Sequence, residues 1–281
     1  MPLPVLDALL LGVVEGLTEF LPVSSTGHLI LVNHWLERQS GAGLEAKAAS
    51  DAYLVIIQLG ALLAAIWYYR QTYWQLVRGL LRGEAAAQRL FRNLCLAALP
   101  VLLLGYLAGK WIKAHLFRPE TVTAALIVGG LVMLVMDGYV KRRGQSGGAA
   151  QPAGQDGASL PWPRALLVGL VQALALWPGT SRSMACIVGG QLAGLSTAAA
   201  ADFTFLLALP TLGVATAYEL LKGGRGLVVA VGAAPMFVGL AVAFAVGFLV
   251  IAAFLRYLRR FGLWPFGCYR IAVGLLLLWV L

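Results

Sequence analysis

Two glutamates, Glu15 and Glu19, lie four residues apart inside the otherwise apolar stretch Val5–Leu36. On a helix this spacing places both carboxylates on the same face. An acidic side chain inside a membrane costs at least about 2.5 kcal/mol, so a partner must offset the charge. A divalent cation, a nearby arginine or protonation of one carboxyl group would do so. The pair therefore indicates acid–base or metal-binding chemistry, and hydration of both acids at the membrane surface is the structural alternative.

A run of three hydroxyl residues, Ser24, Ser25 and Thr26, follows a proline in the same stretch and precedes the helix expected over Leu29–Leu36. Capping of a helix N-terminus would need only one such residue. The backbone amides at the N-terminus of a helix also attract phosphate. His28 lies one turn inside this helix. Its neighbouring acids and hydroxyls favour proton transfer or phosphate contact over a purely structural role.

A second polar segment, residues 178–183, interrupts the apolar stretch Ala165–Leu195. A Pro-Gly pair makes the turn, and hydroxyl residues surround Arg182. The guanidinium group of arginine is planar and permanently charged, and its donors suit phosphate oxygens. Burial of this cation requires an anion, and Glu15, Glu19 and a bound phosphate are the candidates. The segment therefore predicts an anion-binding group, with a structural Arg–Glu pair as the alternative.

The composition of the chain indicates which elements position these residues. Of the 281 residues, 60% are hydrophobic and only 12% are charged, whereas soluble domains carry about 25% charged residues. This excludes a water-soluble enzyme and a disordered chain, and three scattered cysteines do not make a disulfide scaffold or a zinc site. The sequence predicts an all-α polytopic membrane protein. Its net charge of +9 indicates basic loops facing the cytoplasm rather than a nucleic-acid partner.

A helix needs about 20 apolar residues to span a membrane. Six stretches meet or approach this length: Asp51–Tyr69, Asn93–Gly109, Val122–Tyr139, Asp202–Leu221, Pro235–Leu255 and Cys268–Leu281. The halves of the two broken stretches are only about ten residues long, which indicates re-entrant helical hairpins. Basic residues concentrate in alternate loops, the third of which is expected to hold Arg256, Arg259, Arg260 and Arg270. With these loops in the cytoplasm, both chain ends lie outside, and the hairpins enter from opposite sides, the first from outside.

The two halves of the chain resemble each other. Residues 10–15 align with residues 167–172, and residues 22–25 then align with residues 178–181. The sequence therefore predicts an inverted-topology repeat whose two breaks meet in a shared site near the bilayer midplane. Within one membrane domain, residues 1–143 and 161–281 are the predicted repeats, each a re-entrant hairpin plus three spans. Residues 144–160 are predicted to form a flexible cytoplasmic loop between them.

Residues 15–28, EGLTEFLPVSSTGH, resemble the first signature of the undecaprenyl pyrophosphate phosphatase family, which is linked to bacitracin resistance. Residues 176–183, LWPGTSRS, resemble its second signature, and residues 205–210 are also similar, although Cys186 stands where the family usually has threonine. The resemblance implies a phosphoric anhydride hydrolase that converts undecaprenyl pyrophosphate to undecaprenyl phosphate and inorganic phosphate. Such an enzyme recycles the lipid carrier for peptidoglycan. The resemblance also implies the bacterial cytoplasmic (inner) membrane, a divalent cation (Mg²⁺ or Ca²⁺) and a site open to the periplasm.

With this resemblance, the predicted catalytic residues are Glu19, Ser25, His28 and Arg182. Glu15 and Glu19 are predicted to bind the cation, and the predicted phosphate-binding residues are Ser24, Thr26, Gly179, Thr180, Ser181, Arg182 and Ser183. In this hypothesis Ser25 attacks the outer phosphorus and His28 or Glu19 takes its proton, while attack by a metal-activated water or by His28 stays open. A lipid-phosphate flippase that uses the same site for binding is the alternative function. The predicted partners are the lipid substrate and membrane lipids, with no nucleic acid, and a homodimer is one open oligomeric state.

Overall fold

The structure, a computed structural model, describes residues 3–40, 44–146, 157–258 and 260–280. These residues form eleven α-helices and one 3-10 helix, with no strand among them, which confirms the all-α polytopic membrane fold. The helices are α1 (Val5–Thr18), α2 (Ser25–Ser40), α3 (Leu44–Tyr68), α4 (Arg70–Leu81), α5 (Ala85–Leu116), α6 (Pro119–Ser146), α7 (Trp162–Ala173), η1 (Leu174–Leu176), α8 (Arg182–Leu192), α9 (Thr197–Val231), α10 (Ala233–Leu258) and α11 (Trp264–Val280).

Four helices within the described part of the chain, α5, α6, α9 and α10, are long and apolar enough to cross a membrane. They match four of the six predicted spans. The first predicted span falls in α3, which bends by 67° into α4, so the two helices make a fifth span only when taken together. The last predicted span falls in α11, which has 17 residues, fewer than the about 20 that are typical of a full crossing. The structure therefore has four or five spans of this kind where the sequence predicts about six.

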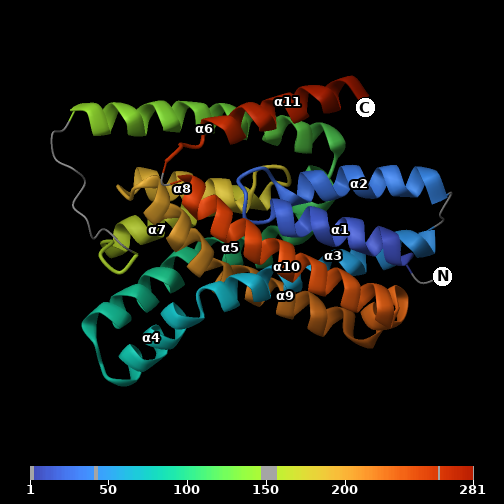
Figure 1. The fold of residues 1–281 in the computed structure, drawn as a ribbon, viewed down its shortest axis with the longest axis horizontal. Coiled ribbons are helices and arrows are strands. Elements are labelled where there is room, and N and C mark those ends of the chain that lie inside the picture. Colours follow the sequence, from blue (N-terminus) through green and yellow to red (C-terminus); the bar gives the residue numbers. More distant parts are fainter. Residues whose placement is uncertain (1–2, 41–43, 147–156, 259, 281) are drawn as a thin grey trace.

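Helix α11 lies along α6 (Figure 1). Glycines let the two helices approach closely, since a Cβ atom at Gly130 would lie 2.7 Å from the carbonyl oxygen of Gly267. The expectation that Arg270 lies in a basic cytoplasmic loop is wrong. Arg270 belongs to α11 and has no exposed surface, because its guanidinium group is surrounded by backbone carbonyl groups to which it donates hydrogen bonds.

Each predicted re-entrant segment consists of two helices separated by a break with the same local geometry. The first break lies between α1 and α2, and the second lies between η1 and α8. Ser24 and Ser181, the residues directly before α2 and α8, have φ angles of 75° and 73°, in the left-handed region. The Oγ atom of Ser24 accepts a hydrogen bond from the Gly27 amide, and that of Ser181 accepts one from the Met184 amide, each at 3.3 Å. Both serines therefore cap the helices that follow them.

This shared geometry corrects the alignment of the two halves by one residue. The sequence alignment placed Ser25 opposite Ser181, whereas the N-cap geometry places Ser24 opposite Ser181. The second break contains one more residue between its proline and its cap than the first. As a result, Ser25 and Arg182 occupy equivalent positions, the first residues of α2 and α8.

The predicted flexible loop, residues 144–160, is only partly described. Helix α6 extends to Ser146, and residues 147–156 lie outside the described residues. Residues 157–160 form a turn that is fixed from α5, because the buried side-chain amide of Asn93 donates hydrogen bonds to the carbonyl oxygens of Gly157 and Leu160, at 2.9 and 2.8 Å. Residues 144–146 therefore belong to α6 and residues 157–160 to a turn held by α5. The flexible loop between them and the division into two repeats stay predictions.

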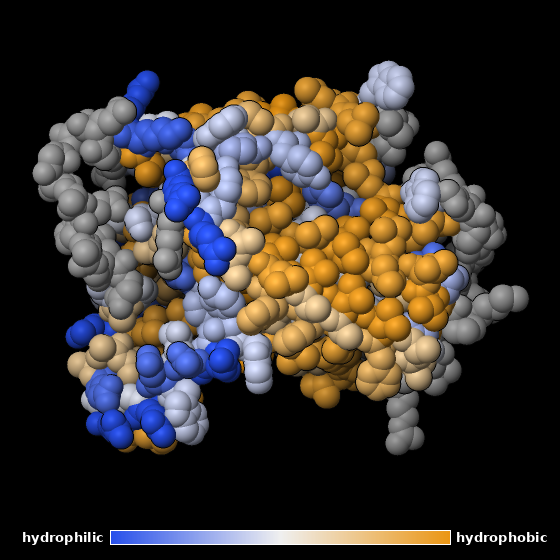
Figure 2. Space-filling view, in the orientation of Figure 1, coloured by the Kyte–Doolittle hydropathy of each residue, from blue (hydrophilic) through white to orange (hydrophobic). Residues whose placement is uncertain are grey.

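The surface carries the apolar residues that the composition requires. Figure 2 shows a broad apolar area over one end of the molecule. Hydrophilic residues gather toward the opposite end, where α4 lies. Large side chains are exposed along α5, among them Leu99, Leu103, Tyr106 and Leu107. Exposed apolar side chains in such numbers suit contact with lipid tails rather than water. The chain is a multi-pass membrane protein.

Candidate active site

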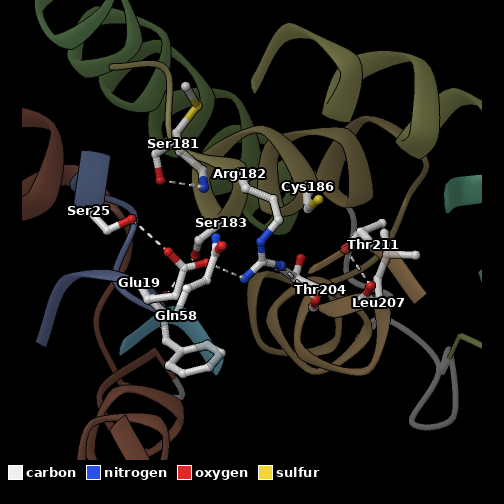
Figure 3. Close-up of polar contacts among 12 residues, drawn as sticks. Glu19, Ser25, Gln58, Ser181, Arg182, Ser183, Cys186, Thr204, Leu207 and Thr211 are labelled. Atoms are coloured by element: carbon white, nitrogen blue, oxygen red, sulfur yellow. Dashed lines mark hydrogen bonds and ion pairs between the residues drawn. The ribbon is translucent and has the colours of Figure 1, made fainter. Parts of the chain in front are cut away.

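Glu19 is the centre of a buried polar cluster between the two breaks. It directly follows α1, and its amide donates to the carbonyl oxygen of Glu15, so the helical course continues through it. Its carboxylate oxygen Oε1 accepts a hydrogen bond from Nη2 of Arg182 at 3.2 Å, and Oε2 accepts one from Oγ of Ser25 at 2.6 Å. Figure 3 shows Ser25 and Arg182 reaching Glu19 from different sides. The structure thus brings together three of the four predicted catalytic residues.

The ion pair in this cluster is shielded from solvent. The Glu19 side chain is 6% exposed and the Arg182 side chain is 11% exposed. Nη1 of Arg182 also donates to the carbonyl oxygen of Thr204 at 3.3 Å, whereas Nε is buried and has no partner among the described residues. Arg182 therefore keeps one donor that a further anionic oxygen could accept from.

Glu15 lies one helical turn before Glu19 and is also buried, at 2% exposure. Its Oε2 atom has no hydrogen-bond partner among the described residues. Four buried side-chain atoms of the described chain lack a partner in this way, and the site holds two of them, the other being Nε of Arg182. A buried carboxylate oxygen without a donor is costly unless a cation or proton satisfies it.

The donor set at the site can be compared with what a divalent cation needs. The described residues contain no group of three or more His, Cys, Asp or Glu side chains placed to hold a metal ion. Mg²⁺, however, usually takes only one or two carboxylates and completes its shell with water and substrate phosphates. Glu15, with its unpartnered oxygen, and Glu19 fit a cation that is bound together with a phosphate group.

The predicted phosphate-binding hydroxyls differ in the hydrogen bonds that they make. Ser24 and Ser181 cap α2 and α8. The hydroxyl of Ser183 is fully buried and donates to the carbonyl oxygen of Phe20 at 2.7 Å, which links the second break to the first. Thr26 lies at the start of α2 and is exposed. The hydroxyls of Ser24, Ser181 and Ser183 therefore already have hydrogen-bond partners that stabilise the two breaks.

Gly179 and Thr180 form the turn of the second break. Their carbonyl oxygens accept hydrogen bonds from Arg270 at 2.8 and 2.9 Å. Gly179 has a φ of 95°, and a Cβ atom there would lie 2.5 Å from the carbonyl oxygen of Val122. Only glycine fits this position, because both the backbone conformation and the available space exclude a side chain.

His28, in the first turn of α2, has its hydrogen-bond partners outside the cluster, and the Ser25 hydroxyl donates to Glu19. Its Nδ1 atom lies 2.8 Å from the carbonyl oxygen of Ser24, and its Nε2 atom lies 2.8 Å from the hydroxyl of Tyr269. A carbonyl oxygen only accepts, so Nδ1 carries a hydrogen, and in the neutral ring Nε2 accepts from the Tyr269 hydroxyl. Both ring nitrogens of His28 therefore have partners other than Ser25.

Three further residues lie next to the site. Arg270 and Tyr269 reach it from α11, and Gln58 reaches it from α3, with its side chain pointing toward Glu19 (Figure 3). The Gln58 side-chain oxygen also lies 3.5 Å from the Thr216 hydroxyl. A charged residue inside an apolar helix is a functional candidate by default, and this signal would have identified Arg270 had it not been assigned to a loop.

Comparison with known proteins shows which family the whole chain resembles. A family model described as "Bacitracin resistance protein BacA" matches residues 8–276. A protein of Sorangium cellulosum strain So ce56 named undecaprenyl-diphosphatase is 54% identical over 275 residues, which are 98% of this chain and 85% of that protein. Proteins of the same name from Methylococcus capsulatus and Cupriavidus necator are 46% and 44% identical, and each alignment covers 97% of this chain and 93% or 94% of the relative.

Proposed function

The chain belongs to the family of the bacitracin resistance protein BacA, and we propose that it hydrolyses undecaprenyl diphosphate to undecaprenyl phosphate and inorganic phosphate. The observation that carries this proposal is the buried cluster in which Ser25 and Arg182 share the carboxylate of Glu19. A nucleophile, a base and an anion-binding group are in direct contact there, as hydrolysis of a phosphoric anhydride requires.

Binding of the diphosphate is the role of Arg182 and the helix starts beside it. The guanidinium group is permanently charged and keeps an unpartnered Nε donor. Ser25 and Arg182 are the first residues of α2 and α8, and the first-turn amides of a helix have no partner within it. Two helix N-termini and one guanidinium group therefore converge on the place where phosphate charge would develop.

Ser25 and Glu19 carry the chemical step in this proposal. Oγ of Ser25 forms a bond to the outer phosphorus as the bond from that phosphorus to the bridging oxygen breaks, and the Ser25 proton passes to Oε2 of Glu19, which already accepts it at 2.6 Å. Undecaprenyl phosphate leaves, and water then cleaves the phosphoserine to give inorganic phosphate and restore Ser25.

Glu15 and Glu19 would hold a divalent cation, Mg²⁺ or Ca²⁺. When bound, such a cation neutralises charge on phosphate oxygens. Glu15 supports the assignment through its buried and unpartnered Oε2 atom. We expect chelation to abolish phosphate release from the purified protein and either cation to restore it, since two buried carboxylates without a cation would repel the anionic substrate. Undiminished release after chelation would refute the metal assignment.

We place the enzyme in the bacterial inner membrane with its site open to the periplasm. Arginines cluster where α4 meets α5, among them Arg78, Arg82, Arg89 and Arg92. Basic residues of this kind favour the cytoplasmic side of a membrane. The undecaprenyl tail would lie among apolar helices and membrane lipid, so the protein surface around the tail needs no specific polar contact with it.

Phosphate release from undecaprenyl diphosphate in detergent tests the function. We expect wild-type protein with Mg²⁺ to release phosphate and Arg182→Ala to lose about 100-fold or more in kcat, as expected for a main electrostatic stabiliser. Arg78→Ala, on the exposed side of α4, is the matched control and should keep its activity. A wild-type protein that binds the lipid but releases no phosphate would refute hydrolysis and favour a lipid-phosphate flippase instead.

A further inference from the structure

Arg270 uses every donor of its guanidinium group on backbone carbonyl groups. The side chain has five N–H groups, and the structure shows five carbonyl acceptors at 2.8 to 3.3 Å. These acceptors belong to Pro22 in the first break, to Gly179 and Thr180 in the second break, and to Ala125 and Leu126 in α6.

We propose that Arg270 is a positioning residue for the hydrolysis, which holds the two breaks at the spacing that lets Ser25 and Arg182 meet on Glu19. The proposal rests on the function proposed above. Because all five N–H groups have carbonyl partners, Arg270 has no donor left for a phosphate oxygen. It therefore acts through the backbone of the breaks rather than by touching the substrate.

The geometry explains why the backbone needs such a residue. Carbonyl groups in the breaks lie outside helices, and buried carbonyl groups require partners. Pro22 lies three residues before Ser25, and Thr180 lies two residues before Arg182, so both acceptors sit next to the residues that contact Glu19. Displacement of reacting groups by about 1 Å can cost about 100-fold in rate. A loss of these hydrogen bonds should therefore affect kcat more than substrate binding.

Gly129 of α6 leaves room for the guanidinium group of Arg270. A Cβ atom at Gly129 of α6 would overlap Nη2 of Arg270. Gly129→Ala therefore displaces the guanidinium group while leaving its charge and its residue in place. Gly138, on the same helix, has no atom within 4 Å of the position that its Cβ would take. Gly138→Ala is thus a matched control for the substitution itself.

Arg270→Lys separates the charge of Arg270 from its hydrogen bonds. Lysine keeps the positive charge but has only three N–H donors, so at least two of the five carbonyl groups lose their partner. If Arg270 acts by positioning, Arg270→Lys and Gly129→Ala should both lower kcat by about 10-fold or more and change KM by less than about threefold. Gly138→Ala should stay within about twofold of wild type.

Hydrogen exchange in detergent supplies a readout besides activity. We expect residues 19–28 and 178–185 to exchange faster in Arg270→Lys and Gly129→Ala, while α10 keeps wild-type protection. A normal kcat in Arg270→Lys, or faster exchange throughout the molecule, would overturn the proposal, because Arg270 would then act by charge alone or support the whole fold. Wild-type protein that releases no phosphate would refute the proposed function instead, and the exchange comparison would still test whether Arg270 holds the breaks.

Discussion

Ser25 and Glu19 should behave as one catalytic unit. The hydroxyl of Ser25 donates to Oε2 of Glu19 at 2.6 Å, so the nucleophile and its base share one proton in the resting site. Glu19→Gln removes the base, and Ser25→Ala removes the nucleophile. Without Glu19 the Ser25 hydroxyl has no acceptor for its proton, and without Ser25 that proton transfer does not occur, so the two losses overlap. The double variant should therefore lose little more activity than the more damaged single variant.

The contacts at Glu19 set the size of the expected effect. A positioned general base contributes typically about 100- to 10,000-fold to the rate, so each single variant should lose about 100-fold or more in kcat. Independent contributions would multiply to about 10,000-fold or more in the double variant. Glu19→Gln also leaves the buried Arg182 without its anion, and breaking one partner of a buried pair costs about 3–5 kcal/mol of stability.

The assay is phosphate release at saturating undecaprenyl diphosphate, with thermal unfolding measured on each variant in the same detergent. Glu219→Gln is the matched control, because Glu219 forms an exposed pair with Lys113 and such pairs contribute about 0–1 kcal/mol. A double variant that loses activity multiplicatively would refute the shared-proton arrangement. A nearly normal Ser25→Ala beside an inactive Glu19→Gln would show that water, activated by Glu19, is the nucleophile.

Two further substitutions test contacts next to the site and away from it. Tyr269→Phe removes the hydroxyl that donates to Nε2 of His28 and should cost about 0.5–1.5 kcal/mol of stability, the contribution of one hydrogen bond, as measured by thermal unfolding. The same change in a His28→Phe background should cost nothing further. Asn93→Ala leaves the carbonyl groups of Gly157 and Leu160 without their partner and should lower the thermal midpoint, at a cost of about 1–3 kcal/mol per unsatisfied group, while kcat stays unchanged.

Length and apolarity predict α5, α6, α9 and α10, because a helix that crosses lipid must satisfy its own backbone and show apolar side chains along its whole length. The bend between α3 and α4 has no such local signal, since neither proline nor glycine lies there. It depends on contacts with a distant helix: the hydroxyl of Tyr69 donates to Asp202 at 2.6 Å, and that of Tyr73 donates to the carbonyl oxygen of Leu206 at 3.0 Å. Such contacts between helices are not visible in a hydropathy pattern.

Within the site, residue type predicts that Arg182 needs an anionic partner, because a buried charge requires an opposite one. Glu15, Glu19 and a bound phosphate are the candidates from sequence, and the structure shows the pair with Glu19. Residue type does not separate Ser25 from Ser24, which has the same side chain one position earlier. The left-handed conformation of Ser24 turns its hydroxyl back onto the helix amides and leaves Ser25 to face Glu19. The φ angle of Ser24 therefore decides which of the two adjacent hydroxyls caps the helix and which contacts Glu19.

The two breaks share one backbone geometry but carry different side chains directly after it. Ser24 and Ser181 have matching φ angles and matching cap hydrogen bonds, so the residues after them leave the break at equivalent positions. One of these positions holds a hydroxyl and the other a guanidinium group, and both donate to the same carboxylate. Arg270 contacts both breaks just before these positions, through carbonyl groups that every residue type has. Sequence comparison of the two halves cannot show such a contact, because side-chain identity in the breaks does not encode it. The proposed chemistry therefore depends on the side chains of Ser25 and Arg182. Their contact with Glu19 depends in turn on backbone that Arg270 of α11 holds in place.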